Sequence, residues 1–253
     1  MTSGPPPLRA PWSGVSVACF AAAVVLLVSR LFLAGQWDGF AASAEVSLLM
    51  LAAVPVLLAV GVSTGRAARS ADVQAGITRP DPPAAGRSAR RSRTMLAAAL
   101  GVANLAVIAA GAMHILVWNP LARVPGLSLN EIYGQMRAVG EGTAAGGFVA
   151  SWAGFWSFAT VLYVIACALP LRQVGTRRRV AVAGLLLIGA TCILAWTAGF
   201  NMGMSLADAF GTGGADAAIS GPLLSLAGQL AVAGALFLAC APRRAVAEAP
   251  APA

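Results

Sequence analysis

Long apolar stretches alternate with short polar segments along most of the chain. Six of these stretches have about the 20 residues that an α-helix needs to cross a hydrocarbon core of roughly 30 Å. The sequence therefore predicts six transmembrane helices, near 14–34, 44–62, 95–118, 148–171, 180–200 and 222–241. Proline marks several predicted ends: Pro120, Pro170 and Pro242 close the third, fourth and sixth spans.

Composition supports a membrane protein. Apolar residues make up 58% of the 253 residues and charged residues only 10%, with a mean hydropathy of +0.79. A soluble domain carries roughly 25% charged residues. The net charge of +8 does not indicate nucleic-acid binding, because the basic residues form short runs between the apolar stretches. The predicted fold class is all-α, a polytopic integral membrane helical bundle, whose first partner is the lipid bilayer.

The arginines predict the orientation. Every basic residue is arginine, which is typical of a GC-rich bacterial genome, and all but Arg30, Arg123 and Arg137 lie in alternate segments that share one side. Positive charge beside membrane spans is retained in the cytoplasm. We therefore predict a multi-pass protein of the cell membrane with both ends inside. Its transmembrane domain covers residues 14–241, between cytoplasmic tails at 1–13 and 242–253.

The loop at 63–94 is rich in arginine, proline and alanine and has almost no large apolar residue. Such a segment buries too little surface to fold by itself, so we predict a disordered basic loop on the cytoplasmic side. Topogenic charge and a linker role explain it more simply than docking of an acidic partner.

The second outer loop contains a clear helix signal. Ser128-Leu129-Asn130-Glu131 fits a capping box, and apolar residues then recur at helical spacing up to Met136. We predict a short amphipathic helix from about Leu129 to Val139 that lies on the outer surface or caps the bundle. A second, shorter helix is predicted to start at Ser205 and to end before Gly211.

His114 is the single histidine, and helical spacing places it with Asn104, Gly111 and Trp118 on a small, polar face that should point into the bundle. An imidazole there could carry a proton or bind a metal. With the thioethers of Met202 and Met204 it would suit Cu(I), although methionine is also an ordinary filler of apolar gaps. We expect no cofactor, with copper at His114, Met202 and Met204 as the alternative.

Three further polar residues lie within predicted spans. Arg30 is near enough to the outer end of the first span to reach the head groups, or to pair with Asp38 or Glu45. Asn104 and Gln229 lie at comparable depths, where they could form hydrogen bonds between helices. For all three residues a structural role is the simpler interpretation.

Three functions remain open. The first is a transport role, as a permease-like protein or an accessory subunit of a membrane complex, with other membrane subunits or further copies of the chain as partners. The second is redox or copper handling through His114 and the outer methionines. The third is an enzyme that acts on a lipid-linked substrate with outer carboxylates such as Glu131, Glu141 or Asp208.

Overall fold

The computed structural model of the chain describes residues 16–24, 60, 62–64, 66–67, 70, 87–141, 145–169 and 176–240. These residues are helical apart from turns and short connections, and they include no strand. Two compact units are distinguished, one of residues 1–85 with 236–253 and one of residues 86–235. The second unit contains nearly all the described structure.

The second unit is built from helices joined by short connections, and the last of these helices, α8, extends five residues into the first unit. They are α3 (Arg87–Met113), the π-helix η2 (His114–Trp118), α4 (Asn119–Arg123), α5 (Leu129–Ala138), α6 (Ala145–Ala168), α7 (Arg177–Phe210) and α8 (Ser220–Cys240). Four helical stretches are long and apolar enough to cross a membrane: Ser88–Arg123, Gly146–Ala168, Arg177–Phe210 and Ser220–Cys240. They correspond to the last four predicted spans. The all-helical character is thus confirmed for the described part of the chain, which contains four candidate membrane-spanning helices.

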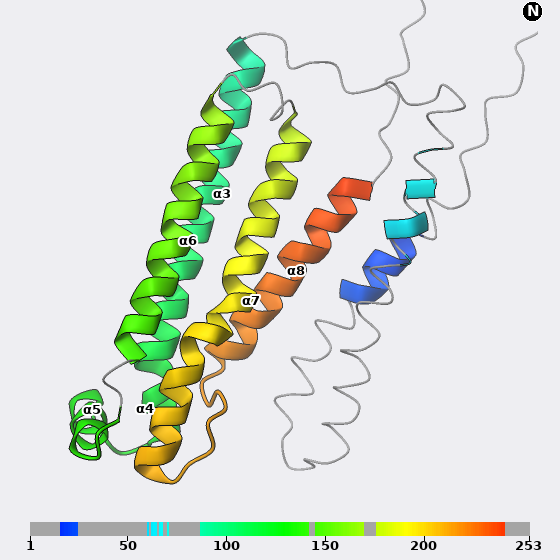
Figure 1. Cartoon of the computed structure of the whole chain (residues 1–253). Coiled ribbons are helices and arrows are strands. Elements are labelled where there is room, and N and C mark those ends of the chain that lie inside the picture. The colour runs from blue at the N-terminus through cyan, green and yellow to red at the C-terminus, as the bar shows by residue number, and fades with distance from the viewer. Residues whose placement is uncertain are drawn as a thin grey trace, which may run out of the picture. The chain divides into compact units, whose positions relative to one another are not determined.

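Helices α3, α6 and α7 pack side by side (Figure 1). Small residues let them approach closely: a Cβ atom added at Gly111 of α3 would lie 2.8 Å from the Trp152 ring of α6. One buried polar contact joins the same two helices, from the Asn104 side-chain amide to the Thr160 hydroxyl at 2.8 Å. Close packing through small residues, with an occasional polar contact, is typical of helices inside a membrane.

Helix α8 meets α7 where two glycines face each other. A Cβ atom at Gly189 would lie 3.1 Å from the Gly228 carbonyl oxygen, and one at Gly228 would lie 2.5 Å from the Cys192 Cβ. Neither position has room for a side chain, so this crossing depends on glycine.

The start of α3 differs from the prediction. The helix begins at Arg87, so residues 87–94 are helical where a disordered loop was predicted. Arginine is a good helix former, and Arg90 donates through Nε to the Ala168 carbonyl of α6 at 3.0 Å. This contact joins the first turns of α3 to the last turn of α6.

The prediction that Pro120 closes the third span was also wrong. The helix continues to Arg123 because five residues, His114–Trp118, form a π-helix in which the Asn119 amide donates to the His114 carbonyl. A wider turn relieves the clash that a proline ring makes with the preceding turn. Pro120 cannot donate to the Leu116 carbonyl, and the Tyr133 hydroxyl donates to it instead, at 2.8 Å. The turn also changes the helical register, so Trp118 is exposed, whereas Asn104 and His114 are buried as predicted.

The separate helix predicted from Ser205 does not form. Helix α7 runs without a break from Arg177 to Phe210, and Ser205 is buried within it. No proline interrupts the region around Phe200, so nothing in the sequence ends the helix there. Gly211 does provide the stop, in the left-handed conformation with φ of 62°.

The first unit is described only in part. Residues 16–24 are helical, and the Phe20 ring packs edge-on against Phe237 with centroids 5.5 Å apart. Most of the first two predicted spans, and both predicted tails, lie outside the described residues.

Candidate functional site at the capped end of the bundle

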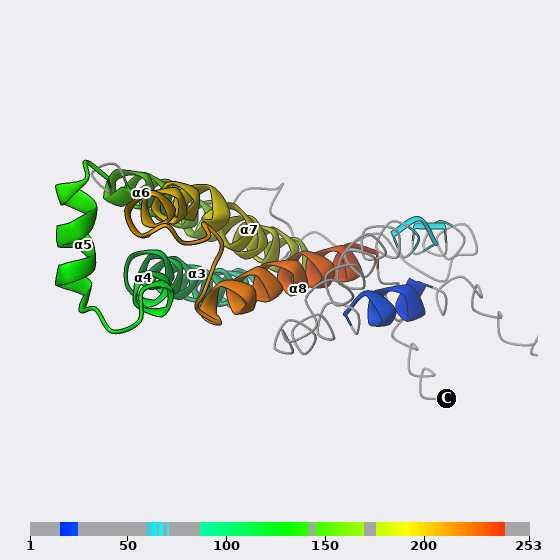
Figure 2. The same cartoon turned by 90° about the horizontal axis from the view of Figure 1, so that it is seen from below.

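One end of the second unit is covered by α5 and by the loop at 211–219, and we call it the capped end. Helix α5 lies across this end in Figures 1 and 2. Ile132 and Met136 have no exposed surface, and they pack in a cluster with Ile115 and Met202. The predicted amphipathic helix is therefore confirmed, and its apolar stripe docks on the bundle.

The N-terminus of α5 has the predicted capping box. The Ser128 hydroxyl accepts from the Glu131 amide, and the Glu131 carboxylate accepts from the Ser128 amide at 2.7 Å. The side-chain and backbone hydrogen bonds from Ser128 hold the pKa of the Glu131 carboxyl below its ordinary value of 4.5. Gly140 follows the helix with φ of 83°, which suits the predicted stop.

We expect this cap to weaken in acid. Because the folded-state pKa of Glu131 is lowered, its contribution to stability is present above the ordinary value of 4.5 and is lost as the pH falls through the lowered pKa. The protection factors of the first-turn amides of α5, which correct the exchange rates for their intrinsic pH dependence, should therefore fall below that pH. In Glu131→Gln, whose amide oxygen still accepts but does not titrate, the extra acid sensitivity should be absent. Equal acid sensitivity in both proteins would contradict the assignment.

His114 lies at the start of the π-helix and is only 5% exposed. Its Nδ1 is 2.8 Å from the Ser220 Oγ at the first residue of α8, and its Nε2 is 3.2 Å from the Asp216 Oδ1. The Asp216 side chain is about half exposed. One imidazole thus connects α3, the loop before α8 and α8 itself.

The hydrogen bonds favour one arrangement of protons. An ionised Asp216 can only accept, so a neutral His114 donates from Nε2 to Asp216 and accepts at Nδ1 from the Ser220 hydroxyl. A serine hydroxyl held by an imidazole that is oriented by a carboxylate is the arrangement that activates serine nucleophiles. The same three groups also form a simple structural latch.

Two more side chains hold the same loop. The Asn119 Oδ1 accepts from the Ala217 amide at 2.7 Å and from the Ala218 amide at 3.4 Å. Arg123 donates to the Ala215 carbonyl. Asn119 is buried, so its amide side chain replaces water as the partner of these two loop amides. Asn119 and Arg123, at the end of the third predicted span, thus hold the loop at 211–219 in place.

Two of the three predicted copper ligands, Met202 and Met204, point to different sides of α7. Met202 is buried in the cluster beneath α5, whereas Met204 is 44% exposed. Residues two apart on a continuous helix point to nearly opposite sides, and α7 is continuous here. No group of three His, Cys, Asp or Glu residues that could hold a metal ion occurs in the described part of the chain. Copper binding stays a prediction, one that would require His114 to give up a hydrogen-bond partner.

The other polar candidates have separate positions. Asn104 is fully buried and bonds to Thr160 of α6. Gln229 bonds to Ser225 of its own helix at 3.2 Å, so these contacts do not pair the two residues with each other. Arg30 lies outside the described residues. Of the outer carboxylates, Glu131 is used in the helix cap, and Asp208 is exposed on α7.

Sequence reasoning missed the partners of His114. Asp216 and Ser220 were not singled out, and neither were Asn119 and Arg123. A signal was available, because His114 ends the third span and the 211–219 loop leads into the sixth, so both were predicted to lie on the same side of the membrane. Which loop residue meets the imidazole depends on the path of the loop.

We expect His114→Ala to loosen the loop. The change removes the contacts to Ser220 and Asp216, and each hydrogen bond of this kind contributes about 1 kcal/mol. Hydrogen exchange at the Ala217 and Ala218 amides should accelerate up to about thirtyfold, the equivalent of the two lost hydrogen bonds. Met113→Ala, which changes a neighbouring exposed side chain, should leave the exchange rate unchanged. Identical exchange in all three proteins would show that His114 does not hold the loop.

Comparison with known proteins does not assign the chain to a family. No family model, no curated protein and no solved structure matches it.

Proposed function

We propose that the chain is a six-span protein of the bacterial cell membrane, with both ends in the cytoplasm, which serves as an accessory subunit of a membrane complex or as a permease-like protein. The arginine distribution supports this orientation. Arg90, Arg91 and Arg93 lie near the start of α3, and Arg177–Arg179 at the start of the neighbouring α7. That end would face the cytoplasm and the capped end the outside.

The support for the subunit role comes from the exposed face of α6. Bulky apolar side chains that are about half exposed or more recur along it at spacings of seven, three and four residues, at Phe148, Phe155, Phe158, Leu162 and Ile165, and Leu169 follows directly after the helix end. This is the spacing of a seam between two packed helices. A regular apolar seam along the full length of a span supports the packing of another helix against α6. That helix would come from another subunit or from a second copy of the chain.

A photoreactive amino acid at Phe158 tests this role in intact membranes. An accessory subunit should give one discrete cross-linked product, whose mass identifies either a second copy or a different chain. The same photoreactive amino acid at Trp196 of α7, which is 70% exposed against 63% for Phe158, serves as the control and should give no such product. Lipid adducts alone at both positions would contradict the subunit role.

A second function is favoured by the Ser220, His114 and Asp216 geometry. We propose, as the alternative, acyl transfer on a lipid-linked substrate at the outer surface. His114 would take the Ser220 proton as the oxygen attacks a carbonyl carbon, and would return it to the leaving group. Ser220 is partly exposed, at the end of the bundle that would face such a substrate.

A fluorophosphonate probe distinguishes the two functions. An activated Ser220 should be labelled, and labelling should be lost in Ser220→Ala and strongly reduced in His114→Ala. Ser205→Ala, which changes a buried serine of α7, should label like the wild type. Absence of labelling in the wild-type protein would rule against acyl transfer and leave the three groups as a latch.

A further inference from the structure

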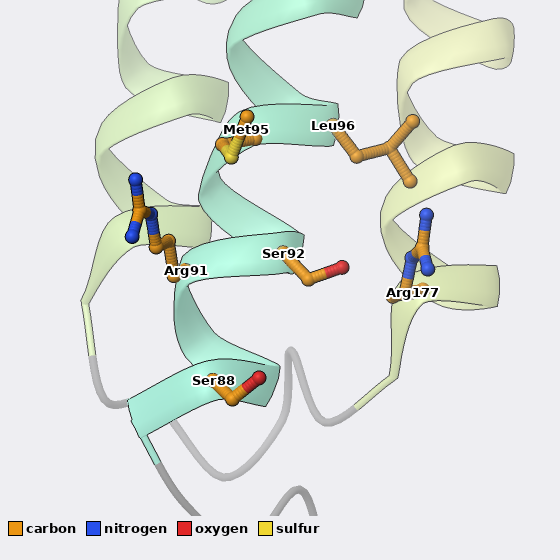
Figure 3. Close-up of a pocket in the computed structure, with 6 residues that line it drawn as sticks. All are labelled: Ser88, Arg91, Ser92, Met95, Leu96 and Arg177. Atoms are coloured by element: carbon orange, nitrogen blue, oxygen red, sulfur yellow. The ribbon is translucent and has the colours of Figure 1, made fainter.

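The opposite end of the second unit contains a shallow cavity, largely open to its surroundings, with a volume of about 410 Å³. It lies between the first turns of α3 and the start of α7, and its lining consists of Ser88, Arg91, Ser92, Met95, Leu96 and Arg177. Figure 3 shows Arg91 and Arg177 flanking the part of α3 that bears the two serines and Met95. None of these residues takes part in the site at the capped end.

The polar part of the lining suits a phosphate group. Two guanidiniums and two hydroxyls can donate to an anion, and no carboxylate belongs to the lining. Among the described residues, neither Arg91 nor Arg177 has a hydrogen bond or an ion pair with another side chain. Arginine binds phosphate oxygens with paired, charge-assisted hydrogen bonds. Both guanidiniums are therefore available to an external anion.

The apolar part of the lining distinguishes a lipid from free phosphate. The α3 residues of the lining follow one side of the helix from Ser88 to Leu96. Met95 and Leu96 lie about 10 Å beyond Ser88 and about 5 Å beyond Ser92 along the helix. Met95 is 63% exposed, and the apolar span of α3 continues beyond it. A phospholipid has the same arrangement, with a charged phosphate followed by acyl chains. Inorganic phosphate has no apolar part that could pack against Met95 and Leu96.

We propose that this cavity binds the phosphate of an anionic phospholipid, with Arg91 and Arg177 approaching the phosphate from opposite sides of this part of α3 and Met95 and Leu96 against the first acyl carbons. The two positive charges, with no carboxylate in the lining, favour a lipid of net negative charge over a zwitterionic one. The predicted orientation places the cavity in the cytoplasmic leaflet, where anionic lipids attract basic segments. The site is independent of the function proposed for the capped end.

The test is native mass spectrometry of the detergent-solubilised full chain, titrated with phosphatidylglycerol, phosphatidylcholine or inorganic phosphate. Phosphatidylglycerol should bind in preference to phosphatidylcholine, and inorganic phosphate at the same concentration should not displace it. Arg91→Gln with Arg177→Gln should weaken phosphatidylglycerol binding about thirtyfold, the equivalent of about 1 kcal/mol for each arginine. Arg66→Gln with Arg137→Gln removes the same charge outside the cavity and should leave binding unchanged.

A second variant keeps the test decisive if the arginine variant does not fold. Ser88→Ala with Ser92→Ala removes two hydroxyls and should weaken phosphatidylglycerol binding severalfold. Equal binding of phosphatidylglycerol and phosphatidylcholine, or an equal loss in the control variant, would overturn the proposal. Displacement by inorganic phosphate would show a site for free anions and would overturn its assignment to a lipid.

Discussion

Replacing Ile132 or Met136 with aspartate should release α5 from the bundle. Both side chains are fully buried, and they face the cluster that contains Ile115, Trp152 and Met202. A carboxylate placed there without a partner would cost several kcal/mol, more than a helix of ten residues can recover from its other contacts. Protease cleavage between Pro125 and Gly140 should increase at least tenfold in proteoliposomes.

Asn130→Asp is the matched control for this experiment. Asn130 belongs to the same helix and gains the same charge, but its side chain is exposed. Negative charge in the first turn of a helix is also favourable. Cleavage of this variant should equal that of the wild type. If all three variants are cleaved alike, α5 is not docked through Ile132 and Met136.

Gly228→Ala should separate α7 from α8. The added Cβ would lie 2.5 Å from the Cys192 Cβ and 3.2 Å from the Gly189 carbonyl oxygen, and neither atom can rotate away. Overpacking of this kind costs about 1 to 3 kcal/mol. The melting temperature of the purified protein should fall by several degrees, which a thermal scan in detergent would detect.

The control for the glycine contact lies on the same helix. At Gly234 an added Cβ would lie 3.7 Å from Leu185, an ordinary contact distance. Gly234→Ala should be neutral or slightly stabilising, because alanine is favoured over glycine within a helix by about 1 kcal/mol. The two substitutions should therefore act in opposite directions. A lower melting temperature in both variants would contradict the close contact at Gly228.

Much of the helical structure could be predicted from local sequence. The last four spans follow from apolar runs of membrane length, and α5 follows from Ser128, Glu131 and the spacing of Ile132 and Met136. These signals are local, because a cap or an amphipathic stripe is encoded within about ten residues. Burial of His114 and Asn104 was also predictable, because both lie on the small, polar face of one helix.

The remaining features depend on contacts between distant segments. Pro120 normally ends a helix, and its accommodation requires the π-helix and the Tyr133 hydroxyl, which comes from α5. The partners of His114 lie about 100 residues away in sequence, in the loop before α8 and at the first residue of α8. The path of that loop is set by Asn119 and Arg123. No local pattern specifies such a path, so the site at the capped end became visible only in the structure.

The proposed orientation of the membrane bundle places its arginine-rich end in the cytoplasm and its capped end outside. Ser88 and Ser128 test it most directly, because a continuous helix from Ser88 to Arg123 separates them. In a variant without the four native cysteines, Ser128→Cys should react with an impermeant thiol reagent in intact cells. Ser88→Cys should react only after the membrane is permeabilised. Labelling of Ser88→Cys from outside in intact cells would contradict the account.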